Sequence, residues 1–306
     1  MPYLQRWVLL LIACAGSASA RSAPEGTFEP GTAETAGAGV QLPEYRFGVE
    51  PISSTRALWR RYRPFTSAVN AAVSGFSIRL ESALQAPGYE RKLRAGEFDL
   101  VVVEPHRVLE IERLNYRVFA RAGREDGIEG VIVVRADAQL ERPAELNGKV
   151  VCFGPPNALA STLLPRMWLR EAGFSERKSQ ISFTGSEDTA LFSVWRGLAD
   201  AAAVSRTAWE HFLSDHVQAS MLKAKWRTAR LSGAAVMTHG RVPAEHIRQL
   251  EAAFTHLDET EPGRRALRGL GLKSLRAADA SAYDDVWEFL TSYARLFGYQ
   301  APGVGR

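Results

Sequence analysis

Short apolar runs alternate with amphipathic segments along most of the chain. Residues 45–49 alternate apolar and polar side chains, as in a half-buried strand, and residues 55–73 have the apolar spacing of a helix. Further strands are predicted at 76–84, 99–103, 116–120, 131–134, 150–153, 181–184, 201–204 and 234–238, and further helices at 89–94, 106–114, 158–172, 187–196, 206–213, 243–257, 262–270 and 280–298. Strands that alternate with helices predict an α/β fold with mainly parallel sheets flanked by helices.

The length of the chain and the order of these elements predict two lobes. After an N-terminal leader and linker, roughly 260 residues remain, which is too many for one ordinary hydrophobic core. We expect residues 44–138 and 232–300 to form the first lobe and residues 139–231 the second, with crossings near Asp137 and Leu231. Two lobes imply a ligand cleft between them.

Residues 1–20 have the features of a signal peptide. One basic residue, Arg6, precedes an apolar run over 7–15, and Ala18-Ser19-Ala20 forms a cleavage signal of small residues. The run of roughly 10 apolar residues is shorter than the roughly 20 that span a bilayer. Leu11 to Cys14 also resembles a bacterial lipobox, so lipidation of Cys14 is the alternative to cleavage after Ala20. Both alternatives predict an exported, periplasmic protein.

The amino-acid composition of the chain limits the kinds of ligand and partner that we expect it to bind. Residues 21–43 are rich in Gly, Ala, Ser, Thr, Pro and Glu, so we expect a flexible linker. The 38 Lys and Arg residues are dispersed among 34 Asp and Glu residues, and the net charge of +4 fits a small anionic ligand and requires no nucleic acid. Cys152 has no second cysteine beyond Cys14 of the leader, so no disulfide framework is expected.

The turn after the strand 150–153 is the strongest candidate for a binding site. Gly154-Pro155-Pro156 breaks the strand and leads directly into a helix rich in small and hydroxylated residues. The backbone N–H groups around Ala160, Ser161 and Thr162 are therefore predicted to point at one spot, as in anion sites at helix N-termini. The alternative is that Ser161 and Thr162 make ordinary local hydrogen bonds to the backbone.

Polar residues beyond other strands are further candidates. Ser53 and Ser54 follow the first strand and His106 follows the strand 99–103, where parallel sheets place their ligand crevice. Ser186 and Glu187 open the helix that follows the strand 181–184. The structural alternatives are helix caps for the serines and a favourable first-turn charge for Glu187.

The chain resembles the periplasmic solute-binding components of phosphonate, phosphite and phosphate ABC transporters over about residues 45–272. The matching segments are Phe47-Gly48-Val49 with Pro51, Gly96 to Val101, Pro105-His106, Asn147-Gly148-Lys149, Pro156 to Pro165, Leu169 to Gly173, Thr184-Gly185-Ser186 and Gly197 to Ala201. The resemblance implies a two-lobed periplasmic-binding-protein fold of type II. It also implies capture of a small oxyanion, as a monomer without metal or cofactor, for an ABC permease in the inner membrane.

Departures from the family pattern bear on the ligand. Where phosphonate binders of the family carry a Ser-Thr-Ser-Gly run, this chain has Ala158-Leu159-Ala160-Ser161, which keeps the amides but loses hydroxyls. Glu187 aligns with a family histidine, and Thr207 aligns with an acidic position. A carboxylate at Glu187 would repel a phosphate unless it pairs with Arg206 or accepts a hydrogen bond from the ligand. A zwitterionic or cationic ligand is therefore the alternative to an oxyanion.

Two other classes of function stay open at this point. The chain contains none of the motifs G-x-S-x-G, H-E-x-x-H and G-x-x-x-x-G-K-[ST]. The best catalytic hypothesis makes Cys152 a nucleophile that His106 activates. The argument against it is that a cysteine in an apolar strand is expected to be buried. The third hypothesis is a ligand-sensing accessory protein that docks on a membrane sensor, because sensing and transport both need two lobes that close on a ligand.

Overall fold

The computed structural model describes residues 42–51 and 55–298. The predicted signal peptide, Cys14 and almost all of the predicted linker lie outside the described residues, as do the candidate site residues Ser53 and Ser54. Among the described residues, no helix has the length and apolar character needed to cross a membrane.

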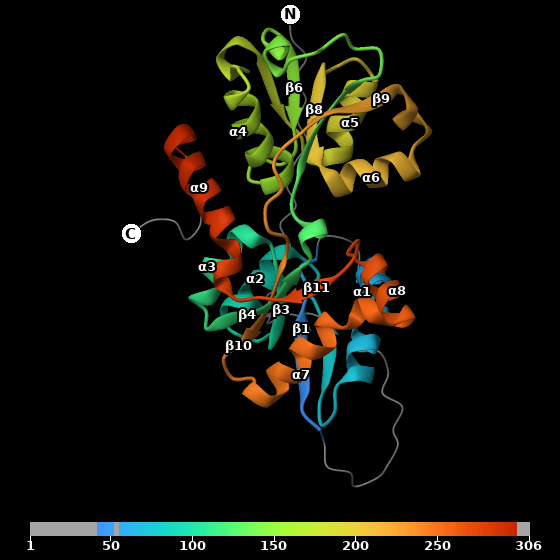
Figure 1. Cartoon of the computed structure of the whole chain (residues 1–306), viewed down its shortest axis with the longest axis vertical. Coiled ribbons are helices and arrows are strands. Elements are labelled where there is room, and N and C mark those ends of the chain that lie inside the picture. The colour runs from blue at the N-terminus through green and yellow to red at the C-terminus, as the bar shows by residue number, and fades with distance from the viewer. Residues whose placement is uncertain (1–41, 52–54, 299–306) are drawn as a thin grey trace, which may run out of the picture. The chain divides into compact units, whose positions relative to one another are not determined.

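The first lobe is built on a six-stranded sheet with the strand order β11-β4-β10-β3-β1-β2. Its strands are β1 (Glu44–Gly48), β2 (Ser77–Glu81), β3 (Leu100–Val103), β4 (Tyr116–Ala122), β10 (Ala235–His239) and β11 (Leu275–Ala277). Its helices are α1 (Thr55–Ala72), α2 (Ala86–Arg94), α3 (Val108–Glu112), α7 (Ala244–Thr255), α8 (Glu261–Gly269) and α9 (Asp284–Phe297). Figure 1 shows α1, α2, α3, α7 and α8 grouped around the strands of this sheet.

The second lobe is built on a five-stranded sheet with the strand order β7-β6-β8-β5-β9. Its strands are β5 (Gly130–Arg135), β6 (Val150–Phe153), β7 (Gln180–Phe183), β8 (Ala201–Ser205) and β9 (Leu222–Arg227). Its helices are α4 (Leu164–Glu171), α5 (Glu187–Trp195) and α6 (Arg206–Asp215), which Figure 1 shows around β6 and β8.

Both sheets are mixed, which corrects the expectation of mainly parallel sheets. β1 runs parallel to β2 and β3, and β6 runs parallel to β7 and β8. β10, however, is antiparallel to β3 and β4, and β5 is antiparallel to β8 and β9. The chain passes from one sheet to the other and back, and the first strand after each passage, β5 or β10, enters its sheet in the direction opposite to the parallel strands.

The passage into the second lobe comes earlier than expected. β5 pairs with β8 and β9, so the chain crosses within residues 123–129 and not near Asp137. The boundary between the lobes therefore lies before β5 and not at the expected position 138/139. The expectation was wrong because the apolar run of β5 predicts a strand but does not indicate which sheet the strand joins. The return passage lies between β9 and β10. The two passages pair through Ile128 and Leu231, whose N–H groups each donate to the other residue's carbonyl at 2.9 Å.

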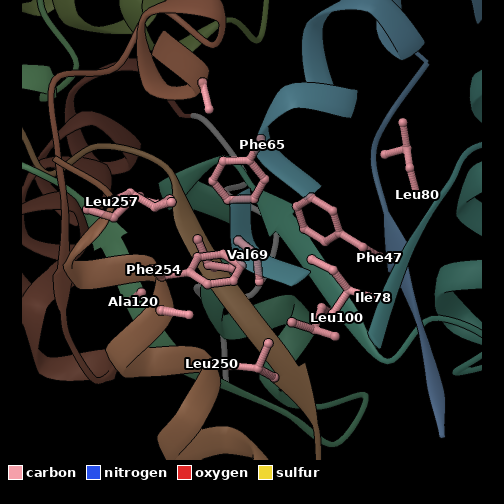
Figure 2. Packing of buried hydrophobic residues seen from close by; sticks show 14 of the residues in the cluster. Phe47, Phe65, Val69, Ile78, Leu80, Leu100, Ala120, Leu250, Phe254 and Leu257 are labelled. Atoms are coloured by element: carbon pink, nitrogen blue, oxygen red, sulfur yellow. The ribbon is translucent and has the colours of Figure 1, made fainter. Parts of the chain in front are cut away.

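The core of the first lobe lies on both faces of its sheet. On one face Phe47 of β1 packs with Phe65 and Val69 of α1 and with Phe254 of α7, as Figure 2 shows. The rings of Phe65 and Phe254 meet edge to face with their centroids 5.1 Å apart. Phe65 and Val69 are four residues apart and so lie on one face of α1. Burial of each such side chain stabilises the fold by about 1.5–3 kcal/mol.

The cluster on the other face includes residues of the second lobe. Leu159, Leu163 and Leu164 join the buried side chains of β3, α2, α3 and α9, among them Val103 and Val108. The chain between β6 and α4 therefore packs in the same hydrophobic cluster as residues of the first lobe. This contact places the predicted binding turn where the lobes meet.

Candidate functional site

The turn that follows β6 presents backbone donors. Residues Leu159–Leu163 form a π-helical turn that continues into α4, and the amides of Thr162 and Leu163 both donate to the carbonyl of Ala158 at 3.0 Å. The amides of Leu159, Ala160 and Ser161 come before the first intrahelical acceptor can be reached. Three successive N–H groups are therefore available to an anion at this point.

Ser161 and Thr162 differ in what their hydroxyl groups do. Both side chains are fully buried. The Thr162 hydroxyl donates to the carbonyl of Pro155 at 2.8 Å, which is the local backbone bond that we considered as its alternative role. The Ser161 hydroxyl has no hydrogen-bond partner among the described residues. A buried hydroxyl without a partner costs about 1–3 kcal/mol, so Ser161 is the stronger candidate for ligand contact.

Gly154 makes room for the Ser161 side chain. A Cβ atom at position 154 would lie 2.2 Å from Ser161 Oγ, 2.7 Å from Ser161 Cβ and 3.5 Å from Glu187 Cγ. Only a residue without a side chain fits there. The same distances show that the side chains of Ser161 and Glu187 approach each other beside Gly154.

The Glu187 carboxylate is already held by the protein. Ser186 caps α5, and its Oγ accepts the N–H of Thr189 at 3.2 Å. Glu187 accepts the backbone N–H of Ser205 at 3.1 Å and its hydroxyl at 2.7 Å. Ser205 is in turn the N-cap of α6. The negative charge of Glu187 is therefore compensated at a helix N-terminus and not by Arg206.

Arg206 lies in an ion-pair network at the passages between the lobes. Its guanidinium donates to Glu210 at 3.0 Å and to the carbonyl of Glu125 at 3.3 Å, and its Nε lies 3.6 Å from Glu129. Glu129 is buried and also pairs with Arg230 at 2.9 Å and with Arg227 at 3.6 Å. These bonds occupy the two terminal nitrogens of the Arg206 guanidinium, whereas its buried Nε has no hydrogen-bond partner among the described residues.

Thr207 is exposed in the first turn of α6. No interaction of its side chain with Glu187 or with the turn after β6 is present among the described residues. The structure therefore brings Ser161 and Glu187 together beside Gly154, with the amides of Leu159 and Ala160 in the same turn. It does not bring Thr207 to that group.

His106 lies in the 3₁₀ turn Pro105–Arg107, which follows β3. Its Nδ1 is buried without a partner among the described residues. Burial, together with the charge of Arg107, lowers the pKa of the imidazole to about 4. His106 is therefore a neutral group at pH 7, able to accept or donate a hydrogen bond.

We expect the His106 imidazole to titrate near pH 4 when its signals are followed by NMR. The variant His106→Asn identifies these signals, because they disappear from its spectrum. Because the folded pKa lies below the ordinary value of about 6.5, protonation is disfavoured in the folded state. The contribution of this group to the free energy of unfolding is thus complete above about pH 6.5 and is lost as the pH falls toward 4. A midpoint near 6.5 would contradict the burial of the ring.

Two carboxylates that the sequence reasoning missed lie at the carboxyl ends of neighbouring strands. Glu50 follows β1 and Glu104 follows β3. Burial raises the pKa of the Glu50 carboxyl. Loss of hydration, together with the charges of Glu50 and Glu187, raises the pKa of the Glu104 carboxyl, although Glu104 keeps an exposed surface. Their position directly after predicted strands was the available signal, because ligands of α/β proteins bind outside the carboxyl ends of strands.

Cys152 lies in β6 and is 4% exposed. Burial raises the pKa of its thiol, which favours the unreactive protonated form. In the described part of the chain, no three His, Cys, Asp or Glu side chains are grouped so that they could hold a metal ion. The candidate residues in the described part of the chain thus offer backbone amides, hydroxyls, one imidazole and carboxylates.

Residues 47–283 match the family described as the periplasmic substrate-binding protein of phosphonate ABC transporters. No curated protein matches the chain. PhnD1 from Prochlorococcus marinus in complex with methylphosphonate has a similar fold, with a TM-score of 0.67 and 19% identity over 83% of this chain and 98% of that one. A binding protein of an ABC phosphonate transporter from Pseudomonas aeruginosa gives 0.65 and 16% over 83% and 88%. A Xanthomonas citri protein bound to ATP gives 0.64 and 17% over 83% and 98%.

Proposed function

Because this chain belongs to the family of periplasmic phosphonate-binding proteins of ABC transporters, we propose that it captures a small oxyanion of the phosphonate, phosphite or phosphate class for an ABC permease. Proteins of this family bind a solute and do not convert it. The fold is that of the type II periplasmic binding proteins, with two lobes joined by two passages of the chain.

The observation that carries the proposal is the unpartnered hydroxyl of Ser161. It lies in the same turn as the free amides of Leu159 and Ala160, and all three groups are donors of the kind that bind phosphoryl oxygens. Glu187 does not oppose such a ligand strongly, because Ser205 already accommodates its charge. The turn therefore keeps an anion site although it lacks the Ser-Thr-Ser-Gly run.

Capture requires the two lobes to move relative to each other, and the passages are the natural hinges. We place the hinges at residues 123–129 and 228–234, which pair through Ile128 and Leu231. Closure around a solute would bring groups of both lobes onto it and create the surface that the permease recognises.

The proposed function includes export. The predicted signal peptide over residues 1–20 would deliver the chain to the periplasm as a monomer, and lipidation of Cys14 is the alternative outcome. Mass spectrometry of the protein secreted by a bacterial host distinguishes an N-terminus at Arg21 from a lipidated Cys14.

Ser161→Ala is expected to weaken ligand binding by about tenfold or more while leaving the fold at least as stable. Removing the hydroxyl relieves a buried unpartnered group, yet it also removes a hydrogen bond to a charged ligand that is worth about 1.5–3 kcal/mol. Thermal-shift screening with phosphate, phosphite, sulfate and methylphosphonate identifies the ligand, since a concentration of about 100 times Kd adds about 2.7 kcal/mol. Isothermal titration then gives the affinities.

Thr162→Val provides the matched control. It removes the neighbouring hydroxyl, which bonds to Pro155, so it should lower the thermal stability and change ligand affinity much less than Ser161→Ala. If Ser161→Ala binds the identified oxyanion as tightly as the unmodified protein, the turn is not the anion site. If none of the oxyanions shifts the melting temperature, the oxyanion class is wrong.

A further inference from the structure

The outer face of α1 is strongly basic. This helix carries four arginines and no acidic residue over its 18 residues. Arg56, Arg60 and Arg63 follow one another at spacings of four and three residues, so they lie on one face of the helix. All three are exposed, whereas Phe65 and Val69 of the opposite face are buried in the core of the first lobe. The helix therefore turns three positive charges toward solvent.

Helix α8 adds a further arginine beside α1. The two helices lie next to each other in Figure 1, and a Cβ atom at Gly269 of α8 would lie 3.7 Å from the carbonyl oxygen of Arg61. Arg265 is one helical turn before Gly269 and is exposed. The other two arginines of α8 both pair with Glu261, at 3.1 and 3.0 Å. The only acidic residue of α8 is thus already neutralised.

The basic face has no counter-charge within the part of the chain that the structure describes. There, the side chains of Arg56, Arg60, Arg63 and Arg265 make no hydrogen bond and no ion pair with another residue. Like charges four residues apart on a helix, such as Arg56 and Arg60, destabilise it. Stability of the fold therefore does not account for this face, and an anionic partner would compensate its charges.

The chemistry of this face fits an anionic membrane surface better than the surface of another protein. Protein–protein interfaces exclude most charged residues from their core and use aromatic and other apolar anchors there. None of the exposed large apolar side chains among the described residues belongs to α1 or α8. Clusters of basic residues attract proteins to anionic phospholipids, and the fork of a guanidinium group matches the phosphate of a headgroup.

The predicted N-terminal segment would hold the first lobe close to a membrane. β1 begins at Glu44, and α1 is the next element of the chain. If Cys14 is lipidated, roughly 30 residues, which span at most about 100 Å, join the lipid to β1. A lipid chain and a basic patch together attach a protein more firmly than either does alone. If the chain is instead cleaved after Ala20, the basic face is the remaining attraction.

We infer that the face formed by Arg56, Arg60, Arg63 and Arg265 docks the protein on an anionic phospholipid membrane. This role goes beyond the proposed function and does not depend on which solute the protein captures. Docking would raise the effective concentration of the protein beside a permease in the same membrane.

Co-sedimentation with lipid vesicles tests the docking. The protein that begins at Arg21, which carries no lipid of its own, should bind vesicles of equimolar phosphatidylglycerol and phosphatidylcholine and not vesicles of phosphatidylcholine alone. High salt should release it, because salt screens the attraction between exposed charges. Absence of binding to the anionic vesicles would overturn the inference. If the protein ignores these vesicles but binds polyglutamate through the same arginines, its partner is an acidic protein and the membrane is rejected.

The triple variant Arg56→Gln, Arg60→Gln and Arg63→Gln should lower the affinity for the anionic vesicles about 100-fold, since each basic residue at an anionic surface contributes about fivefold. The three side chains are exposed and unpaired, so the melting temperature of this variant should not fall. Replacement of the same residues by lysine keeps the charges and should keep the affinity within about tenfold of the original. Loss of binding in the lysine variant would contradict docking by charge and overturn the inference.

A second triple variant controls for the total charge of the protein. Arg142→Gln, Arg196→Gln and Arg248→Gln remove the same three charges from exposed positions on other elements. This variant should lower the affinity for the anionic vesicles by less than about tenfold, because its residues lie outside the basic face. Equal losses from the two glutamine variants would show that the attraction follows net charge, and the inference would be wrong.

Discussion

Gly154→Ala is expected to lower the free energy of unfolding by about 2–3 kcal/mol and to abolish ligand binding. The added methyl group would lie 2.2 Å from Ser161 Oγ and 2.7 Å from Ser161 Cβ. Rotation of the hydroxyl could relieve the first contact, but the second involves an atom fixed to the backbone. The turn would have to shift and carry its amides away from the ligand. Urea unfolding and isothermal titration measure the two effects.

Gly185→Ala is the matched control for this change. Gly185 is also in the second lobe, and a Cβ atom there meets no atom within 4 Å, so the variant should unfold within about 0.5 kcal/mol of the unmodified protein. The double variant Gly154→Ala with Ser161→Gly removes both clashing atoms and should recover part of the lost stability. Absence of any recovery would show that the loss arises from another contact.

Glu129→Gln should destabilise the protein by about 2–3 kcal/mol. The buried carboxylate lies among Arg206, Arg227 and Arg230, and a neutral amide would leave three guanidinium groups without their common counter-charge. We expect a smaller loss of stability than for a fully buried ion pair, because the side chains of Arg227 and Arg230 are nearly half exposed and solvent screens their charges. The urea midpoint of unfolding measures the loss.

Glu210→Gln tests whether the loss of stability depends on burial of the carboxylate. Glu210 also pairs with Arg206, at 3.0 Å, but its side chain is 54% exposed. An exposed pair four residues apart on a helix contributes about 0.3–0.5 kcal/mol, so this variant should change the midpoint very little. Equal losses from both variants would contradict a special role for Glu129 at the passages between the lobes.

The sequence predicted the elements of this fold better than their arrangement. β3 and β6 were predicted from short apolar runs, and α1 from its period, because these signals depend on neighbouring residues alone. β9 and β11 were missed, since short strands with charged residues such as Lys223 and Arg276 carry a weak pattern. The sheet of β5 could not be predicted, because an apolar strand fits either sheet and pairing is decided by distant residues.

In the candidate site, too, the sequence predicted what is local to one segment of the chain and not the contacts between distant segments. The turn from Gly154 to Thr162 was predicted, because its chemistry is local to one segment of the chain. The partner of Glu187 was not predicted, because Ser205 is 18 residues away along the chain and β7 and β8, which precede the two residues, both pair with β6. Glu50 and Glu104 were missed for a different reason: a glutamate after a strand is common, and only the three-dimensional surroundings that raise the pKa of these two carboxyls distinguish them.

The buried thiol of Cys152 has a practical consequence. The sequence contains two cysteines, and the other, Cys14, lies in the predicted leader. A protein that begins at Arg21 would thus present no accessible thiol to a fluorescent maleimide. One cysteine added at an exposed position of the second lobe, such as Leu198→Cys (Leu198 is 67% exposed), would accept a single dye, and the labelled protein could report the concentration of its own solute in real time.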